Sequence, residues 1–257
     1  MFINNFDPVA FQILSLEIRW YSLAYIIGII LGWAYCKKKL IKDPHILSLF
    51  DDFITYIIVG VILGGRLGYA LLYNLKYYLE NPFEILMVWN GGMSFHGGLI
   101  GVIVASGLFS RKHKINQFIF LDLVALSAPI GIFFGRIANF VNSELIGRAT
   151  DLPWSVQFIL IDNIKRHPSQ LYEAFFEGII LFLLLLYFFK KNYSKNPGKI
   201  SALFLIFYSL FRFFAEFFRS PDAHIGYLIL NLTLGQLISV LFLVVGSFLF
   251  YLKNNEK

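Results

Sequence analysis

Cysteine is almost absent from this chain, which has one, Cys36, among 257 residues. A single cysteine excludes an internal disulfide and any cysteine-based metal cluster. Charged residues make up only 15% of the chain, against about 25% in an average soluble domain. The sequence also lacks a phosphate-binding Walker loop, a His-x-x-Glu-His zinc motif and a Gly-x-Ser-x-Gly nucleophile motif. We therefore expect no metal and no cofactor.

Apolar residues are abundant instead, at 58% of the chain, and aromatic residues reach 18%. A run of about 20 apolar residues suffices to cross a bilayer, so the sequence predicts an all-α polytopic membrane protein with seven transmembrane helices. The predicted spans are 20–35, 53–73, the glycine-rich stretch to about 109, 118–140, 171–189, 200–218 and 232–251. We predict one integral-membrane domain over residues 1–257. Between spans four and five, the polar stretch 142–170 predicts a small extracytoplasmic cap, with a strand at 154–158.

The lysines and arginines predict the orientation, because cytoplasmic flanks retain positive charge. Thirteen of the 22 follow spans one, three, five and seven: Lys37, Lys38, Lys39, Lys42, Arg111, Lys112, Lys114, Lys190, Lys191, Lys195, Lys199, Lys253 and Lys257. The amino terminus is therefore expected outside and the carboxyl terminus inside. The net charge of +6 then reflects topology, and we expect no nucleic-acid partner.

Glycines crowd around one histidine in the segment 91–101, which reads GGMSFHGGLIG. Glycine inside a helix costs about 1 kcal/mol relative to alanine, so this density predicts close backbone approach or a broken helix beside a ligand. His96 is therefore a candidate functional residue. Gly60, Gly64 and Gly68 form a separate small-residue ridge in the second span, which we interpret as packing.

Several ionisable side chains lie within the predicted spans. Such a charge costs about 2.5 to 3.5 kcal/mol at a helix centre, so it usually faces a cavity or a partner. The orientation places a group of polar residues toward the outer leaflet: His96, Arg136, Asn139, Glu173, Glu177, Arg212, Glu216 and Arg219. Tyr208 joins the last three on one face of span six. These residues predict one site near the outer surface.

Structural interpretations compete with this one. Arg212 and Glu216, four residues apart, have the spacing of a structural ion pair within one helix. Arg66 in the second span suits a structural role as well as a functional one. These structural roles do not explain why several arginines and His96 are predicted at the same depth in the membrane. A functional site is therefore the favoured interpretation.

Arginine carries a permanent charge and a fork of N–H donors that suits phosphate. Several arginines in the outer leaflet fit a phospholipid head group better than a dilute aqueous anion. A neutral histidine nearby could accept a proton from a nucleophile as general base. The residues therefore predict a reaction on lipid.

Six motifs resemble, in the right order and over almost the whole chain, the bacterial prolipoprotein diacylglyceryl transferases. They are WYSLAY (20–25), GGRLGY (64–69), HGGLIG (96–101), GRIANFVNSELIGR (135–148), HPSQLYEA (167–174) and FRFFAEFFRSPD (211–222). The resemblance implies a seven-span inner-membrane enzyme. Its implied reaction moves diacylglyceryl from phosphatidylglycerol to the lipobox cysteine that follows a preprolipoprotein signal peptide, forming a thioether and releasing glycerol phosphate. Ser143 departs from the pattern, where we expect glycine.

The resemblance also implies site residues. Arg136 belongs to the phosphatidylglycerol-binding signature, with Asn139, Glu144 and Gly147 in the same block. His96 and Tyr21 match positions important for activity. A second cluster comprises Tyr208, Arg212, Glu216 and Arg219, and we place Arg66 with the substrate-binding residues.

The reading of the residues and the resemblance combine into one hypothesis. Arg136 and Arg212 hold the phosphate of phosphatidylglycerol while the thiolate of the substrate cysteine attacks the glycerol carbon. The spacing of the residues does not decide whether His96, a carboxylate such as Glu144, or water accepts the thiol proton. The alternative function is a transporter of an anionic lipid or organic anion. That function favours inverted repeats and midplane broken helices, whereas the chain shows no internal repeat.

Overall fold

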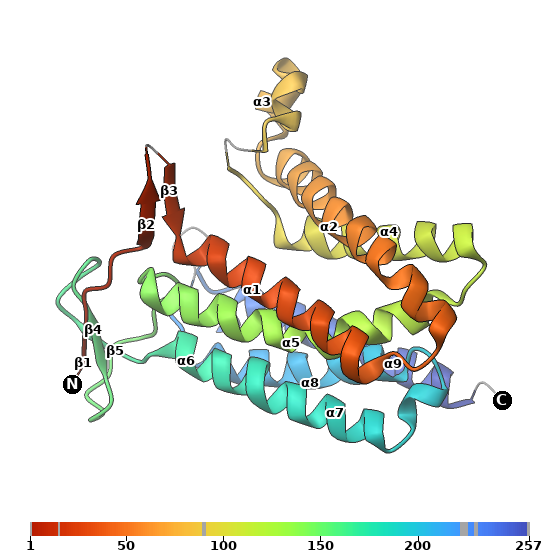
Figure 1. The fold of residues 1–257 in the computed structure, drawn as a ribbon. Coiled ribbons are helices and arrows are strands. Elements are labelled where there is room, and N and C mark those ends of the chain that lie inside the picture. Colours follow the sequence, from red (N-terminus) through yellow and green to blue (C-terminus); the bar gives the residue numbers. More distant parts are fainter. Residues whose placement is uncertain (1, 15, 89–90, 222–225, 229–230, 256–257) are drawn as a thin grey trace. The chain divides into compact units, whose positions relative to one another are not determined.

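The computed structural model describes residues 2–14, 16–88, 91–221, 226–228 and 231–255, which are mostly helical (Figure 1). The α-helices are α1 (Trp20–Tyr35), α2 (Pro44–Tyr73), α3 (Leu75–Glu80), α4 (Phe95–His113), α5 (Gln117–Val141), α6 (Ser169–Glu173), α7 (Leu181–Lys190), α8 (Lys199–Ala215) and α9 (Leu234–Asn255). Wider π-helical turns are η1 (Cys36–Leu40) and η4 (Ala174–Ile180), and 3₁₀ turns are η2 (Pro82–Leu86) and η5 (Tyr193–Lys195). The strands are β1 (Phe2–Asn4), β2 (Val9–Ile13), β3 (Leu16–Arg19), β4 (Val156–Phe158) and β5 (Lys165–Arg166).

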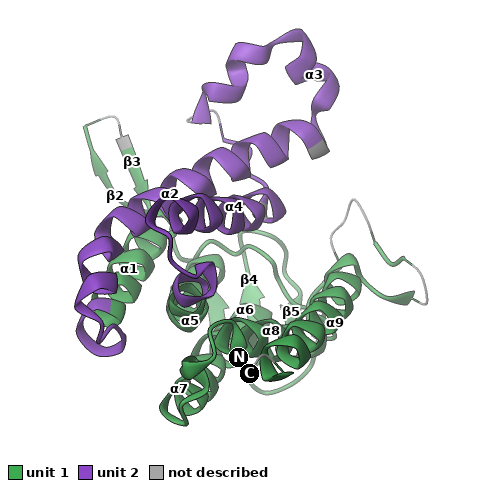
Figure 2. Ribbon diagram, turned by 90° about the vertical axis from the view of Figure 1, so that its right-hand side faces the viewer, with its two compact units in different colours: residues 1–36, 122–257 green, residues 37–121 purple. Residues whose placement is uncertain are grey.

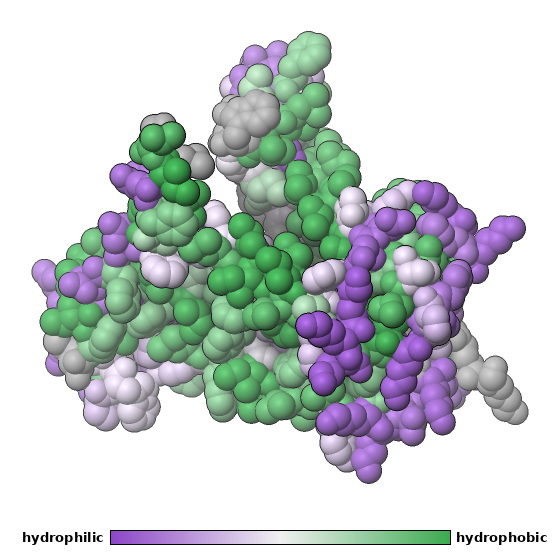
Figure 3. Space-filling view, in the orientation of Figure 1, coloured by the Kyte–Doolittle hydropathy of each residue, from purple (hydrophilic) through white to green (hydrophobic). Residues whose placement is uncertain are grey.

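Four helices within the described residues are long and apolar enough to cross a membrane: Pro44–Leu71, Gln117–Val141, Ser169–Lys190 and Leu234–Asn255. They correspond to predicted spans two, four, five and seven. The other three predicted spans coincide with α1, α4 and α8, of 16, 19 and 17 residues. Large apolar side chains such as Ile30, Val244 and Phe248 are exposed, and Figure 3 shows hydrophobic surface over the helices.

The chain forms two compact units, which Figure 2 colours separately. Unit 1 comprises residues 1–36 and 122–257, and unit 2 comprises residues 37–121.

A small sheet caps one end of unit 1. Its strand order is β1-β4-β5, with β1 parallel to β4 and β5 antiparallel to it. The strand predicted at 154–158 is present over its last three residues, Val156–Phe158, as β4. Asn4 in β1 is buried and donates from Nδ2 to the carbonyl of Phe140 at 2.6 Å, which attaches the sheet to the end of α5. The rings of Phe140 and Phe158 pack edge to face beneath it.

The helices of unit 1 approach closely at small residues, and the buried carboxylate of Asp122 links two of them. A Cβ at Gly28 of α1 would lie 2.8 Å from the Cα of Gly131 in α5, so glycine is required at this crossing. At the other end of α5, Asp122 accepts hydrogen bonds from the backbone N–H groups of Gly198 and Ser201, each at 2.8 Å. A carboxylate at a helix N-terminus satisfies donors that lack a partner within the helix. Asp122 thereby joins α5 to the start of α8.

Unit 2 is built on the contact between α2 and α4. A Cβ at Gly60 would lie 2.7 Å from Cβ of Ala105, and a Cβ at Gly68 would lie 2.7 Å from Cα of Gly97. The two backbones therefore touch along this ridge, which confirms the predicted packing role of Gly60, Gly64 and Gly68. No side chain larger than hydrogen fits there without moving one of the helices.

Candidate active site

Six charged side chains gather inside unit 1, and we call them the Arg–Glu cluster: Arg136, Glu173, Glu177, Arg212, Glu216 and Arg219. They come from α5, from the α6–η4 segment, and from α8 with the turn after it. The arginine side chains are only 9–15% exposed, and those of the glutamates 0–5%. Three positive and three negative formal charges are thus held almost out of contact with solvent.

Glu173 joins two arginines from different helices. Its Oε2 lies 2.9 Å from Nη1 of Arg136, and its Oε1 lies 2.9 Å from Nη1 of Arg212. A buried charge is costly unless it is paired, and this carboxylate is paired through both oxygens. Glu173 therefore sets the spacing between the two guanidinium groups.

Glu177 contacts the other edge of the Arg136 guanidinium. Its Oε2 accepts from Nη2 at 2.9 Å and from Nε at 3.2 Å. Its Oε1 lies 3.6 Å from Nη1 of Arg212 and makes no hydrogen bond within the described part of the chain. One carboxylate oxygen thus takes both N–H groups of this edge.

The α6–η4 segment explains why both glutamates reach the same arginines. Glu173 ends α6, and Glu177 lies in the π-helical turns that continue the same candidate span. Side chains four residues apart share a helical face, and π turns inside α-helices occur often at functional sites. A span that is otherwise apolar therefore presents two acids together.

Glu216 is held at the C-terminal end of α8. It pairs with Nη2 of Arg212 and accepts from Thr233 Oγ1 at 2.8 Å. Arg219 lies farther away, with Nη1 3.9 Å from Oε1 of Glu216. The pairing of Arg212 with Glu216 that the sequence suggested is present, and it forms part of the larger Arg–Glu cluster.

The loop after α5 holds Glu144 by its side chain and its backbone. Asn139 donates from Nδ2 to Oε2 of Glu144 at 2.9 Å, and Asn142 donates to Oε1 at 3.3 Å. Ser143 and Leu145 take the left-handed conformation, with φ of 56° and 54°. This region favours glycine, which explains why glycine is expected where this chain has Ser143.

Gly147 lies where chain segments touch. A Cβ there would lie 2.8 Å from Cβ of His167, and Gly147 forms a β-bridge with Arg219. A side chain at Gly147 would displace this part of the cap.

Arg166 links Gly147 to Asp162. It donates to the Gly147 carbonyl at 3.0 Å and forms an ion pair with Asp162. The hydrogen bond from Arg166 holds the pKa of Asp162 below its usual value. In the same part of the cap, burial lowers the pKa of His167.

Two predicted tyrosines lie within electrostatic reach of these groups. Tyr21 in α1 interacts with Glu144 and Arg136, and its hydroxyl lies 3.1 Å from that of Tyr25. Tyr208 in α8 interacts with Glu177 and Arg136. Unit 1 thus brings together every predicted site residue except two.

His96 and Arg66 belong to unit 2. His96 lies in the first turn of α4, whose start is capped by Ser94 Oγ accepting from the Gly97 N–H at 3.2 Å. Arg66 is buried and donates to the carbonyls of Ile85 at 2.9 Å, Glu84 at 2.6 Å and Gly92 at 3.2 Å, and also to that of Gly91. In this structure Arg66 therefore holds the segment that precedes His96, and a contact with lipid stays a prediction.

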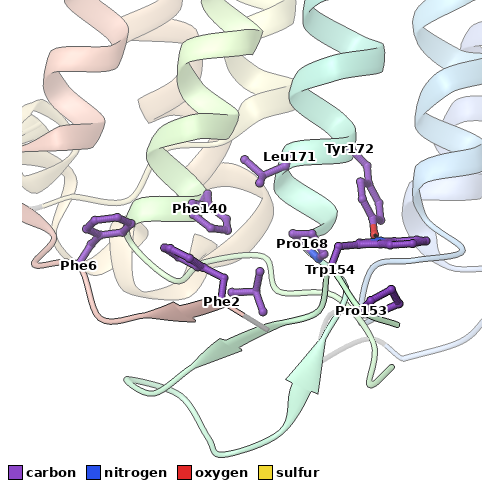
Figure 4. A pocket seen from close by; sticks show the side chains of 9 residues that line it. Phe2, Phe6, Phe140, Pro153, Trp154, Pro168, Leu171 and Tyr172 are labelled. Carbon is purple, nitrogen blue, oxygen red and sulfur yellow. Dashed lines mark hydrogen bonds between the residues drawn. The ribbon is translucent and has the colours of Figure 1, made fainter. Parts of the chain in front are cut away.

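An aromatic pocket of about 710 Å³ lies in the cap of unit 1 (Figure 4). Its lining comprises Phe2, Phe6, Phe140, Pro153, Trp154, Val156, Pro168, Leu171 and Tyr172. Trp154 donates from Nε1 to the Tyr172 hydroxyl at 2.7 Å. None of the predicted site residues lines this pocket.

Glu173 and Glu177 were predicted among the outer-leaflet group, but neither of them was assigned a catalytic or binding role. Their carboxylates carry the same sign of charge as phosphate, so they do not match the pattern expected of residues that bind an anion. The signal in the sequence was their spacing of four residues within the predicted span 171–189, which contains no lysine, arginine or histidine. Such a pair requires cations from other helices.

Comparison with known proteins identifies the family. The family model for prolipoprotein diacylglyceryl transferase matches residues 8–252. A phosphatidylglycerol–prolipoprotein diacylglyceryl transferase of Rickettsia bellii is 50% identical, with 97% of this chain and 96% of that protein covered. Its counterparts in Rickettsia felis and Rickettsia typhi are 50% and 49% identical, covering 99% and 100% of both chains. Together with the apolar helices, this indicates a multi-pass bacterial inner-membrane protein. The chain belongs to the prolipoprotein diacylglyceryl transferase family.

Proposed function

We propose that this protein transfers the diacylglyceryl group of phosphatidylglycerol to the lipobox cysteine thiol that follows the signal peptide of a preprolipoprotein. The Rickettsia relatives are named for this donor and acceptor. The observation that carries the proposal is the pair of arginines, Arg136 and Arg212, which Glu173 joins at 2.9 Å on each side. Two guanidinium groups at fixed spacing suit a phosphodiester, whose negative charge is shared by two non-bridging oxygens.

The reaction is an alkylation at carbon. The thiolate sulfur forms a bond to the glycerol carbon of the diacylglyceryl group, and the bond from that carbon to the phosphate oxygen breaks. The bonding electron pair leaves with the phosphate, and the thiol proton passes to a base. Arg136 and Arg212 would stabilise the charge that gathers on the leaving glycerol phosphate. No cofactor is needed for this step.

His96 is the proposed base, with Glu144 as the alternative. Imidazole suits proton transfer near neutral pH, and the Ser94 cap holds the helix turn that carries His96. Glu144 is held by Asn139 and interacts with Tyr21, both predicted site residues. Asn139, Gly147, Tyr208, Glu216, Arg219 and Arg66 are the remaining proposed substrate-binding residues.

The proposed topology has seven spans, formed by α1, α2, α4, α5, the helix from α6 to α7, α8 and α9. The amino terminus and the β1-β4-β5 cap lie outside, and the carboxyl terminus lies in the cytoplasm. The lysine-rich flanks support this orientation. The Arg–Glu cluster then lies toward the outer leaflet, where phosphatidylglycerol can enter from the bilayer, and residues 1–257 act as one catalytic domain.

The test is direct. Purified protein in phosphatidylglycerol-containing nanodiscs is incubated with a lipobox peptide, and the peptide is analysed by mass spectrometry for a thioether-linked glyceride. A peptide with serine in place of cysteine is the control. Absence of the cysteine-dependent product from folded protein would exclude the proposed function.

A further inference from the structure

The Arg–Glu cluster is already balanced in formal charge, and this constrains how it can accept a phosphate. Three guanidinium groups face three carboxylates that are 0–5% exposed. A phosphodiester carries one negative charge, so adding it to the buried cluster would leave one carboxylate or phosphate charge unpaired. An unpaired buried charge is strongly unfavourable. Lipid binding therefore requires one carboxylate to give up its arginine and either to take up a proton or to reach water.

The three carboxylates differ in what they would lose. Glu173 contacts arginines through both oxygens at 2.9 Å. Glu216 pairs with Arg212 and also accepts from Thr233 Oγ1. Glu177 has one oxygen 2.9 Å from Nη2 of Arg136, and its second oxygen lies 3.6 Å from Nη1 of Arg212. By these distances Glu177 has a short contact with one arginine only and no further side-chain partner such as Thr233, so it is the carboxylate that lipid can displace at the smallest loss.

The edge of Arg136 that Glu177 occupies is also the edge that suits phosphate. Nε and Nη2 both donate to one oxygen, Oε2 of Glu177, at 3.2 and 2.9 Å. A phosphate can offer a separate oxygen to each N–H group, which is the stronger, bidentate arrangement. If phosphate replaces Glu177 at this edge, the contact of Glu173 with Nη1 of Arg136 remains.

We propose that Glu177 is an internal counter-ion that occupies the phosphate position on Arg136 until lipid displaces it, whereas Glu173 is a positioning residue that keeps Arg136 and Arg212 at their spacing. The proposal rests on the proposed function, because it takes the phosphate of phosphatidylglycerol as the incoming anion. Glu177 lies in the π-helical segment Ala174–Ile180, and π turns inside α-helices occur often at functional sites.

The experiment compares Glu177→Gln with Glu173→Gln. Binding of dihexanoyl-phosphatidylglycerol to detergent-purified protein gives a dissociation constant, and the transfer assay gives KM and kcat. Glu177→Gln is expected to bind about tenfold more tightly, with a lower KM, because a competing negative charge is removed. Glu173→Gln is expected to bind about tenfold more weakly, because the arginines lose their common partner. A purely structural role of Glu177 would not tighten binding.

Two controls keep the test decisive. Glu80→Gln, at an exposed position of α3, should leave both constants unchanged. Glu177→Asp keeps the charge but draws it back from Arg136, and should tighten binding to a smaller extent, so it decides the case if Glu177→Gln does not fold. Thermal unfolding verifies each variant.

The outcomes separate the two proposals. If the wild-type protein neither binds phosphatidylglycerol nor forms the thioether, the proposed function fails, and this inference with it. If the wild-type protein does both, but folded Glu177 variants bind lipid no more tightly than it does, the proposed function stands and the counter-ion role of Glu177 is overturned.

Discussion

Arg148 donates from Nε to the backbone carbonyl of Arg219 at 2.9 Å, across 71 positions of sequence. The same guanidinium donates from Nη2 to the carbonyl of Glu216 at 3.3 Å. Carbonyls at a helix C-terminus lack partners within the helix, and a cation there is favourable. Arg148 therefore fixes the end of α8, where two members of the Arg–Glu cluster lie.

Replacing Arg148 by lysine should lower both stability and transfer. A lysine ammonium cannot present two donors in the plane of the guanidinium fork, and each lost hydrogen bond costs about 1 kcal/mol. Thermal unfolding in detergent and the thioether assay measure the two effects. Arg111→Lys, at an exposed position of α4, is the matched control. Equal melting temperatures for Arg148→Lys and wild type would contradict the capping role.

Arg136→Lys should abolish most activity although the charge is kept. The side chain contacts Glu173 and Glu177 through different nitrogens, and a point charge cannot serve both positions and a phosphate. Loss of one donor to a developing oxyanion costs about 10²-fold in rate, so we expect at least a comparable fall in kcat/KM. Full activity would mean that Arg136 supplies only positive charge.

His96→Gln should separate proton transfer from lipid binding. If His96 is the base, kcat at pH 7 falls by about 10²-fold or more while phosphatidylglycerol binding is unchanged. Raising the pH toward the ordinary thiol pKa of about 8.5 should restore part of the rate, because solution then supplies thiolate. His45→Gln, exposed in α2, is the control. Near-normal turnover of folded His96→Gln would direct attention to Glu144.

Ser143→Gly should stabilise the protein. Ser143 is buried with φ of 56°, and its Oγ has no hydrogen-bond partner among the described residues. Glycine removes the strain of the left-handed conformation but also gives the unfolded chain more freedom. The net effect should be an increase of about 1 kcal/mol in the free energy of unfolding. Ser143→Ala removes the hydroxyl but keeps the strain, so it should gain less. Equal melting temperatures for the two variants would exclude the conformational explanation.

The cap should lose stability in acid through Asp162. Because the pKa of Asp162 is lower in the folded protein, its contribution is fully present above the unfolded value of about 3.9 and is lost as pH falls through the folded value. Asp162→Asn removes this contribution, so the difference in melting temperature between wild type and variant should shrink below pH 4. A difference that stays constant with pH would show that the ion pair with Arg166 contributes nothing.

The sequence was most informative where the signal was local. Apolar runs predicted the helices, alternation predicted β4, and the spacing of Gly60, Gly64 and Gly68 predicted their packing. Strand β1 was missed because three residues carry no periodicity and their partner lies far along the chain. The carbonyl partners of Arg66 were also missed, because any residue type provides a backbone carbonyl.

The pairing of β1 with β4 has a consequence for biosynthesis. Phe2 is opposite Val156 in the register, so β1 stays unpaired until β4, 154 residues further along the chain, has been synthesised. Contacts this distant in sequence form slowly. On the proposed topology, residues 2–4 must cross the membrane and stay unpaired while four spans are inserted. A bulky fusion to this end should therefore leave insertion intact and impair late closure of the cap.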